Sequence, residues 1–164
     1  MTGAAMTGAD QASKHSYVLL HVGNRRFALR SELVEELAPP VRLHHFPNTT
    51  ALIAGVIVRR GRIVPVYDVS RVLCGRESSV HRFYLVARRE FGNETEASAI
   101  PVNGECELSN SELIPARDGQ AAHFMGSLDV DGEKIQVLNL EALVSPRAES
   151  AHGAANAEVR AGTR

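Results

Sequence analysis

Tryptophan is absent from this chain of 164 residues, and aromatic residues make up only 5% of it. A folded core must therefore be built mainly from aliphatic side chains, and the 44% hydrophobic content suits a folded globule. Long apolar runs are missing too, because no stretch reaches eighteen consecutive apolar residues, so we expect no membrane-spanning helix. Residues 1–14 contain no apolar segment of the kind that a secretory signal peptide needs.

Neither sign of charge dominates the chain. Its 18 basic and 19 acidic residues leave a formal net charge of -1, so no overall field draws the protein to nucleic acid or to a lipid surface. The two cysteines, Cys74 and Cys106, are too few for a disulfide framework, which fits a reducing compartment. We therefore expect a cytoplasmic protein.

Motifs for catalysis and for metal binding are also missing. The chain has no Gly-x-Ser-x-Gly, no phosphate-binding glycine loop and no paired-carboxylate pattern. His44 and His45 are adjacent, and neighbouring side chains of a strand point to opposite faces. The segment 129–132 begins like a calcium loop, but the closing glutamate of such a loop is missing. We expect no enzyme activity, no metal and no cofactor.

The chain does contain short runs of β-branched residues separated by turns. Residues 56–58 and 63–66 flank Arg59-Arg60-Gly61-Arg62, which predicts a hairpin in which Gly61 supplies the positive φ of the turn. Asp68 is placed to cap a short helix that ends at Gly75. The hairpin therefore carries three arginines at its tip.

A similar pattern recurs at residues 124–144. There the turn is Asp131-Gly132, and the second strand again leads into a short helix, so we infer two related β units. Further strands are predicted at 17–22, 26–29, 34–37, 81–87, 98–102 and 105–108, with a loop at 91–96 and irregular structure at 109–120. Many short strands without a long amphipathic helix predict a mainly β fold made of barrels.

Three motifs lie at separate places along the chain, and the strongest of them is given first. The first is Phe46-Pro47-Asn48 followed by Gly55-Val56-Ile57-Val58-Arg59-Arg60-Gly61-Arg62-Ile63-Val64-Pro65-Val66-Tyr67-Asp68-Val69. The others are Val34-Glu35-Glu36-Leu37 and the segment from Phe124 to Val144. Together they resemble the CheW-like family of bacterial chemotaxis coupling proteins over roughly residues 16–145. The chain has Val58 and Arg59 where the family pattern has asparagine and leucine, and Asn139 where it has aspartate.

This resemblance implies two five-stranded, SH3-like β-barrels packed side by side, with short helices. We expect this domain to span residues 15–146, because the composition of 1–14 and 147–164 is typical of disordered or flexible tails. The resemblance also implies a non-catalytic adaptor. It would couple the cytoplasmic tip of a methyl-accepting chemoreceptor to the regulatory domain of a CheA-type histidine kinase, and would meet the membrane only through the receptor.

The resemblance further implies that the receptor tip docks between the barrels and that the kinase contacts exposed barrel surfaces. The predicted partner-binding residues are Val34, Glu36, Gly55, Val56, Arg59, Arg60, Gly61 and Arg62. For several of them a structural role is an alternative. Arg60 could hold its loop or simply be solvated, Glu36 could face solvent, and Val34 and Val56 could belong to the core.

Two other functions are compatible with the sequence. The protein could be a regulator that competes with a standard coupling protein in a non-flagellar chemosensory pathway. It could instead be a small β-barrel protein that binds nucleic acid through residues 59–62. That function needs aromatic side chains on which bases stack, and only Tyr67 is close to the arginines, so we expect no nucleic-acid partner.

Overall fold

The computed structural model describes residues 14–45, 47, 52–76 and 82–144 of the chain. The elements in chain order are β1 (His15–Val22), β2 (Arg25–Arg30), the 3-10 turn η1 (Ser31–Leu33), β3 (Val34–Ala38), β4 (Ile53–Arg59), β5 (Arg62–Tyr67), α1 (Ser70–Cys74), β6 (Phe83–Phe91), β7 (Glu94–Val102), β8 (Glu107–Ser111), β9 (Ile114–Pro115), β10 (Phe124–Val130), β11 (Glu133–Leu138) and α2 (Leu140–Leu143).

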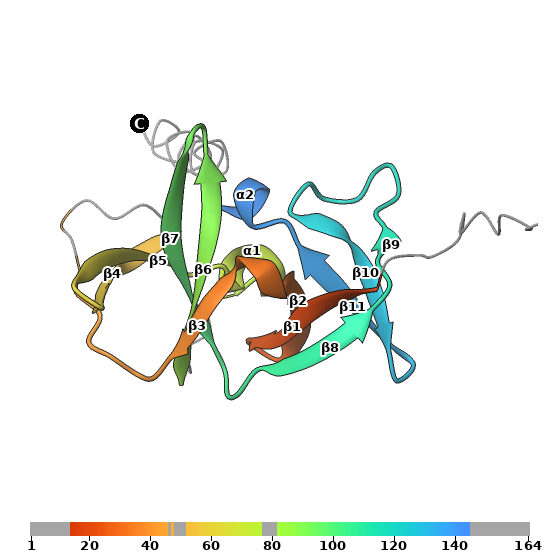
Figure 1. Ribbon diagram of the computed structural model, residues 1–164, viewed down its shortest axis with the longest axis horizontal. Helices are drawn as coiled ribbons and strands as arrows, with labels where there is room; N and C mark the ends of the chain where they lie inside the picture. Colours follow the sequence, from red (N-terminus) through yellow and green to blue (C-terminus); the bar gives the residue numbers. More distant parts are fainter. Residues whose placement is uncertain (1–13, 46, 48–51, 77–81, 145–164) are drawn as a thin grey trace, which may run out of the picture.

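These strands form two sheets that lie side by side (Figure 1). The strand order is β3-β6-β7-β5-β4 in one sheet, here called barrel 1, and β8-β1-β2-β11-β10-β9 in the other, here called barrel 2. Each sheet has one parallel pair, β5 with β7 and β11 with β2. The sixth strand of barrel 2, the two-residue β9, pairs with β10, just as His44 of barrel 1 pairs with Val56 of β4. The expected pair of packed β units is thus confirmed, with five strands in barrel 1 and a short sixth strand, β9, added to barrel 2.

The chain passes through the two barrels in an interleaved order. Barrel 1 is built from one continuous segment, β3 to β7, whereas barrel 2 combines β1 and β2 with β8 to β11. The pairing of β1 with β8 joins His15 to Ser111, and the pairing of β2 with β11 joins Phe27 to Gln136. Barrel 2 is therefore complete only when both ends of the domain have come together.

The β4–β5 and β10–β11 hairpins repeat one another in detail. Each has a register shift next to a glycine, Gly55 in one and Gly126 in the other. A Cβ atom on Gly55 would lie 2.3 Å from the carbonyl oxygen of His44, and one on Gly126 would lie 2.2 Å from that of Ile114. Both central residues of each turn have positive φ, as two-residue hairpin turns of type I′ require. The predicted internal repeat is therefore confirmed.

Three groups of buried apolar side chains stabilise this arrangement. Alternate residues of β1 point to opposite faces, so Tyr17 and Leu19 fill barrel 2 while Val18, Leu20 and Val22 pack in the core between the barrels. Side chains of β6 and β7 also alternate, so that some fill barrel 1 and the others pack in the core between the barrels. The group between the barrels is the largest of the three and takes residues from both barrels and both helices. The barrels therefore share one core.

Several predicted boundaries were wrong. No long loop occupies residues 91–96, because β6 and β7 continue to Phe91 and from Glu94 and leave a tight turn at Gly92-Asn93. The strand predicted at 105–108 is β8 at 107–111, and β9 also falls in the stretch expected to be irregular. Both errors involve strands whose extent is set by partners distant in sequence.

The first helix also differs slightly from the prediction. Its N-cap is Val69, and the Asp68 carboxylate accepts a hydrogen bond from the backbone N–H of Ser70 at 3.1 Å. Gly75 ends the helix with φ 73°, as predicted.

The predicted tails lie outside the described residues, apart from Lys14. Within the described ranges, no helix has the length and apolar character needed to cross a membrane.

Candidate partner-binding surface

Two adjacent glutamates of β3 face the tip of the β4–β5 hairpin. The register of β3 against β6 shifts between Val34 and Glu36, which leaves Glu35 as an extra residue in a β-bulge. A bulge interrupts the alternation of side chains along a strand and re-aims one of them. Both Glu35 and Glu36 can therefore reach the same neighbouring hairpin, which regular alternation would not allow.

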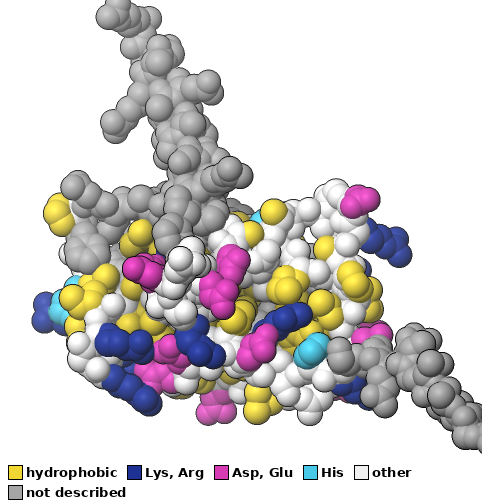
Figure 2. All heavy atoms as spheres, turned by 45° about the horizontal axis from the view of Figure 1, so that its top comes forward, with side chains coloured by type: hydrophobic (Ala, Val, Ile, Leu, Met, Phe, Trp, Pro, Cys, Tyr) yellow, Lys and Arg dark blue, Asp and Glu magenta, His cyan; other side chains and the backbone are white. Residues whose placement is uncertain are grey.

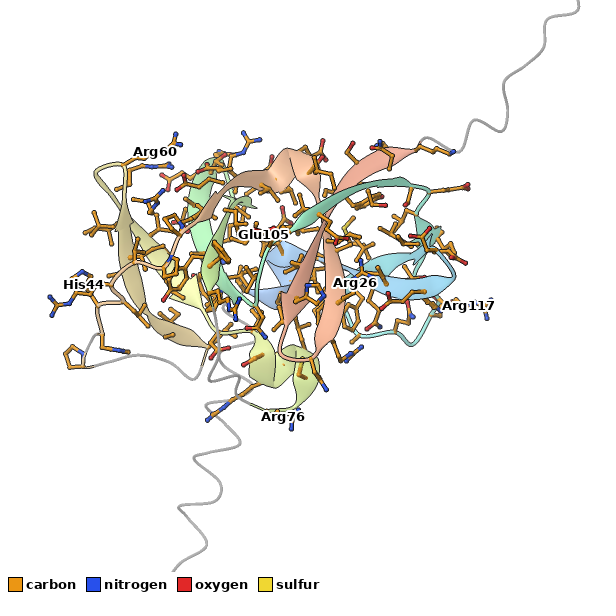
Figure 3. All side chains as sticks on the ribbon, turned by 90° about the horizontal axis from the view of Figure 1, so that it is seen from below. Arg26, His44, Arg60, Arg76, Glu105 and Arg117 are labelled. Carbon is orange, nitrogen blue, oxygen red and sulfur yellow. The ribbon has the colours of Figure 1, made fainter. Side chains whose placement is uncertain are left out.

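The hairpin itself positions three arginines. Arg59 and Arg62 are directly opposite each other in the ladder, and Arg60 occupies the first turn position with φ 50°, followed by Gly61 with φ 75°. Basic side chains surround acidic ones at the left end of the molecule in Figure 2, the same end at which Figure 3 places Arg60. The predicted residues of β3 and of the hairpin tip thus form a single cluster, although they are more than twenty positions apart in the sequence.

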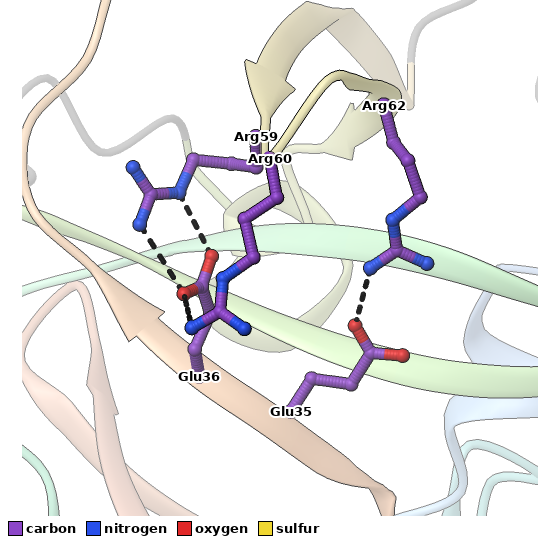
Figure 4. Close-up of polar contacts among 5 residues, drawn as sticks. All are labelled: Glu35, Glu36, Arg59, Arg60 and Arg62. Atoms are coloured by element: carbon purple, nitrogen blue, oxygen red, sulfur yellow. Dashed lines mark hydrogen bonds and ion pairs between the residues drawn. The ribbon is translucent and has the colours of Figure 1, made fainter.

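The contacts within this cluster are ion pairs (Figure 4). The Arg59 guanidinium donates from Nε and Nη2 to the two carboxylate oxygens of Glu36, at 2.8 and 3.2 Å. Arg60 Nη2 lies 3.3 Å from Glu36 Oε2, and Arg62 Nη2 donates to Glu35 Oε2 at 2.9 Å. Since β3 and β4 are the two outer strands of their sheet, the Arg59–Glu36 pair connects its opposite edges.

Exposure separates the three arginines into two kinds. The side chain of Arg59 is 25% exposed and that of Glu36 is 17% exposed, so this two-bond pair is half-buried and holds the hairpin against β3. The side chains of Arg60 and Arg62 are 76% and 56% exposed. The guanidinium groups of these two are therefore largely accessible from solvent.

The hydrogen bonds from Arg59 hold the pKa of the Glu36 carboxyl below its usual value. Partial burial opposes this effect, while the positive charges of Arg59, Arg60 and Arg62 add to it. The same hydrogen bonds raise the pKa of Arg59 above its ordinary value. Glu36 is consequently a structural carboxylate at neutral pH, and the alternative that it simply faces solvent is wrong.

An apolar pair beside the arginines was not identified as part of the site from the sequence. Val58 and Ile63 are direct cross-strand neighbours, and they are 53% and 71% exposed. The equivalent positions of the other hairpin hold Asp129 and Lys134. The apolar pair is therefore specific to barrel 1, and a comparison of the two repeats could have revealed it in advance.

The remaining predicted residues lie deeper in the structure. Gly55 lies directly against the His44 carbonyl, Val56 is 9% exposed, and Val34 is half-buried against the core between the barrels. Gly55 and Val56 therefore position the hairpin, and a direct contact with a partner remains a prediction for them. Tyr67 is buried as well, with 5% exposure, so it offers no stacking surface for nucleic-acid bases beside the arginines.

A further exposed apolar residue lies on barrel 2. Leu108 of β8 is opposite Val18 of β1 in the ladder, and cross-strand neighbours point to the same face of a sheet. Val18 is in the core between the barrels, so Leu108 continues that apolar face outward into solvent, where it is 78% exposed. The sequence suggested alternation up to Leu108 but gave no sign of its exposure.

Barrel 2 has an ion-pair cluster of its own in the corresponding place. Arg26 of β2 lies between two carboxylates, 3.3 Å from Glu107 of β8 and 2.5 Å from Glu133 at the start of β11. Among the residues described, no three His, Cys, Asp or Glu side chains are grouped so that they could hold a metal ion. Chemically, both clusters present partly exposed charged groups at the surface.

Comparison with known proteins supports the fold. A family model described as CheW-like domain matches residues 16–148. Protein FrzA of Myxococcus xanthus is 27% identical over 142 residues, which span 83% of this chain and 89% of FrzA. The crystal structure of the scaffolding protein TtCheW from Thermoanaerobacter tengcongensis matches with a TM-score of 0.69 and 19% identity, covering 80% of this chain and 88% of that one. At that identity the structural match shows the fold.

Proposed function

Because the chain belongs to the CheW-like domain family, we propose that it is a non-catalytic adaptor that couples chemoreceptors to a CheA-type histidine kinase in a bacterial chemosensory array. In this proposal the receptor's cytoplasmic tip docks where the barrels meet, near Val34 and Leu108. The regulatory domain of the kinase binds exposed barrel surfaces. Coupling is positional, because holding the two partners side by side raises their effective concentration and lets receptor shifts bias kinase states.

The observation that carries the receptor part of this proposal is the position of Leu108. A large apolar side chain with 78% exposure, on the sheet face that packs against the other barrel, extends the shared core into solvent. Exposed apolar surface of this kind favours protein association. A helical hairpin with an apolar stripe is a partner that would cover Leu108.

The arginine cluster supports a second contact of the adaptor. Arg60 and Arg62 are exposed on a hairpin that the Arg59–Glu36 pair holds in place, and Val58 and Ile63 add apolar area beside them. A rigid charged surface with an apolar neighbour sets partner orientation and selectivity more than affinity.

Isothermal titration calorimetry with the cognate kinase regulatory domain tests the proposal directly. We expect measurable binding in the micromolar range, and the absence of any binding at high micromolar concentration would refute coupling to that kinase. A reconstituted assay of kinase phosphorylation, with and without receptor, tests the receptor contact. Leu108→Ser should lower receptor-dependent stimulation several-fold while kinase binding stays unchanged.

Ile114→Ser is the matched control for this experiment. Ile114 is also exposed, at 53%, and also on barrel 2, but it lies on β9 rather than on β8. If both variants reduce stimulation equally, Leu108 has no special role in receptor docking. If both are without effect, the receptor binds elsewhere.

The competing-regulator function is favoured by one observation. Val58 is exposed at a position where the family pattern has asparagine, so this surface differs from that of a standard coupling protein. The same phosphorylation assay distinguishes the two functions. An adaptor raises receptor-dependent kinase activity when added alone, whereas a competitor lowers the activity that a standard coupling protein supports.

A further inference from the structure

Each short helix packs against the barrel that does not contain the strand before it. Helix α1 follows β5 of barrel 1 and packs against β1 of barrel 2, whereas α2 follows β11 of barrel 2 and packs against β6 of barrel 1. Figure 1 shows both helices between the two sheets. The helices therefore cross over, and their ends lie where the barrels meet.

An arginine from the opposite barrel binds the end of each helix. Arg25 Nη1, at the start of β2, donates to the carbonyl oxygen of Leu73 in α1 at 2.9 Å. Arg89 Nη1, on β6, donates to the carbonyl oxygen of Val144, the C-cap of α2, at 2.5 Å. The last carbonyls of a helix have no acceptor role within it, so they need a donor from elsewhere. We call these two contacts the crossed clasps.

The first clasp is anchored in barrel 2. Arg25 Nη2 donates to Gln136 Oε1 of β11 at 2.8 Å, and the guanidinium lies 5.0 Å from the centre of the Phe27 ring. Arg25 itself is exposed. Its guanidinium therefore connects two points of its own barrel with the end of α1.

The second clasp repeats this arrangement in barrel 1. Arg89 Nη2 donates to Glu96 Oε2 of β7 at 3.2 Å, and the guanidinium lies 5.6 Å from the centre of the Tyr67 ring. The Arg89 side chain is only 9% exposed. Each clasp thus combines one acceptor and one aromatic ring of the arginine's own barrel with a helix end that comes from the other.

The two clasps occupy matching places in the internal repeat. Leu73 and Val144 lie equally far along the chain from Gly55 and Gly126, the glycines at the two register shifts. The β1–β2 and β6–β7 hairpins, which supply the arginines, hold the same places in the strand orders of their sheets. The contact between the barrels is therefore made twice, in the same way.

The shared apolar core does not by itself fix the angle between the barrels. Burial of apolar surface is non-directional, whereas the planar guanidinium donates its hydrogen bonds in fixed directions. The receptor site proposed above has Val34 on barrel 1 and Leu108 on barrel 2. Its shape consequently depends on the angle that directional contacts impose.

We propose that Arg25 and Arg89 are positioning residues, whose crossed clasps fix the angle between the barrels and with it the separation of Val34 and Leu108. The effect on the receptor site rests on the proposed adaptor function, but the effect on the angle requires neither receptor nor kinase. Arg89 has the larger effect of the two, because its hydrogen bonds are shielded from water whereas Arg25 is exposed.

Residual dipolar couplings of the isotope-labelled full chain test the angle without any partner. In the wild type, one alignment tensor should fit the couplings of both barrels. In the double variant Arg25→Ala with Arg89→Ala, the two barrels should need tensors that differ in orientation or magnitude, because each barrel then moves partly by itself. Circular dichroism checks that the variant is folded. If Arg89→Ala prevents folding, Arg25→Ala alone decides, because that side chain is exposed.

A second measurement tests the consequence for the receptor site. In the double variant, kinase binding by calorimetry should stay within about twofold of the wild type, whereas receptor-dependent stimulation of the kinase should fall about fivefold or more, as for a lost coupling between sites. A merely structural role of the arginines would lower both or neither.

Arg26→Ala is the matched control. Arg26 is next to Arg25 in the sequence, but the two carboxylates that it binds, those of Glu107 and Glu133, belong to its own barrel. This variant should keep a single tensor and full stimulation.

The outcomes separate this proposal from the adaptor function. The proposal is overturned if the wild-type barrels already need two tensors, if the folded clasp variant still fits one, or if Arg26→Ala has the same effect. Two tensors with unchanged stimulation would overturn the link to the receptor site. If the wild type itself neither binds kinase nor responds to receptor, the adaptor function fails while the dipolar couplings still decide whether the clasps fix the angle.

Discussion

The close contact between Gly55 and the His44 carbonyl makes Gly55→Ala a sensitive test of the hairpin geometry. An added Cβ would lie 2.3 Å from that oxygen, so the backbone of one strand or the other has to move. The two segments are joined at this point by a pair of backbone hydrogen bonds, from His44 N to Val56 O at 2.8 Å and from Val56 N to His44 O at 2.9 Å. Any shift that accommodates the methyl group disturbs this bridge.

The size of the effect follows from these contacts. Each lost hydrogen bond costs about 0.5–1.5 kcal/mol net, and an alanine held at φ 156° adds roughly 1–3 kcal/mol of backbone strain. We expect the free energy of unfolding to fall by about 2–6 kcal/mol, from the two hydrogen bonds and the strain together. For a domain of this size that corresponds to a decrease in Tm of roughly 8–24 °C.

Gly61→Ala is the matched control, because Gly61 also has positive φ but its added Cβ meets nothing within 4 Å. This variant should lose only the conformational term, about 1–2 kcal/mol. Differential scanning calorimetry and urea unfolding of both variants measure the difference. A loss for Gly55→Ala that is no larger than that for Gly61→Ala would show that the close approach does not constrain the fold.

Two further predictions concern charge and packing. The folded-state pKa of Glu36 is depressed, so its stabilising contribution is complete above the unfolded value near 4.5 and is lost as the pH falls through the folded pKa. The Tm difference between wild type and Glu36→Gln should therefore be largest at neutral pH and should shrink below about pH 4.5, and a constant difference would contradict this. Leu128→Ala, at a fully buried position, should cost about 2–5 kcal/mol in urea unfolding, whereas Leu108→Ala should stay within about 0.5 kcal/mol.

Local features of the sequence predicted much of this fold. The hairpins at β4–β5 and β10–β11 follow from alternating apolar residues around turn residues that tolerate positive φ, and both are where they were expected. The short helices after β5 and β11 follow from the same reasoning. These elements depend on neighbours in the sequence, which is why a single sequence was enough to find them.

The resemblance implied the pair of packed barrels, but the details that depend on distant partners were not predicted. The extent of β8 is set by its pairing with β1, in which Ser16 Oγ also donates to Asn110 Oδ1, 94 positions away. The position of Glu36 depends on a bulge against β6, and a bulge leaves no sign in the pattern Val-Glu-Glu-Leu. The exposure of Leu108 is likewise a consequence of how the barrels pack.

The interleaved order of the strands has a consequence for how the protein is synthesised. The first hairpin, β1–β2, leaves the ribosome long before its partners β8 and β11, and the whole of barrel 1 is made in between. At about 5–20 residues per second, the roughly hundred residues separating β2 from the end of β11 take on the order of 5–20 s to appear. During that time both edges of the first hairpin, and its apolar faces, have no native partner. Barrel 1 is a continuous segment, so it can form first and provide the surface against which the β1–β2 hairpin packs.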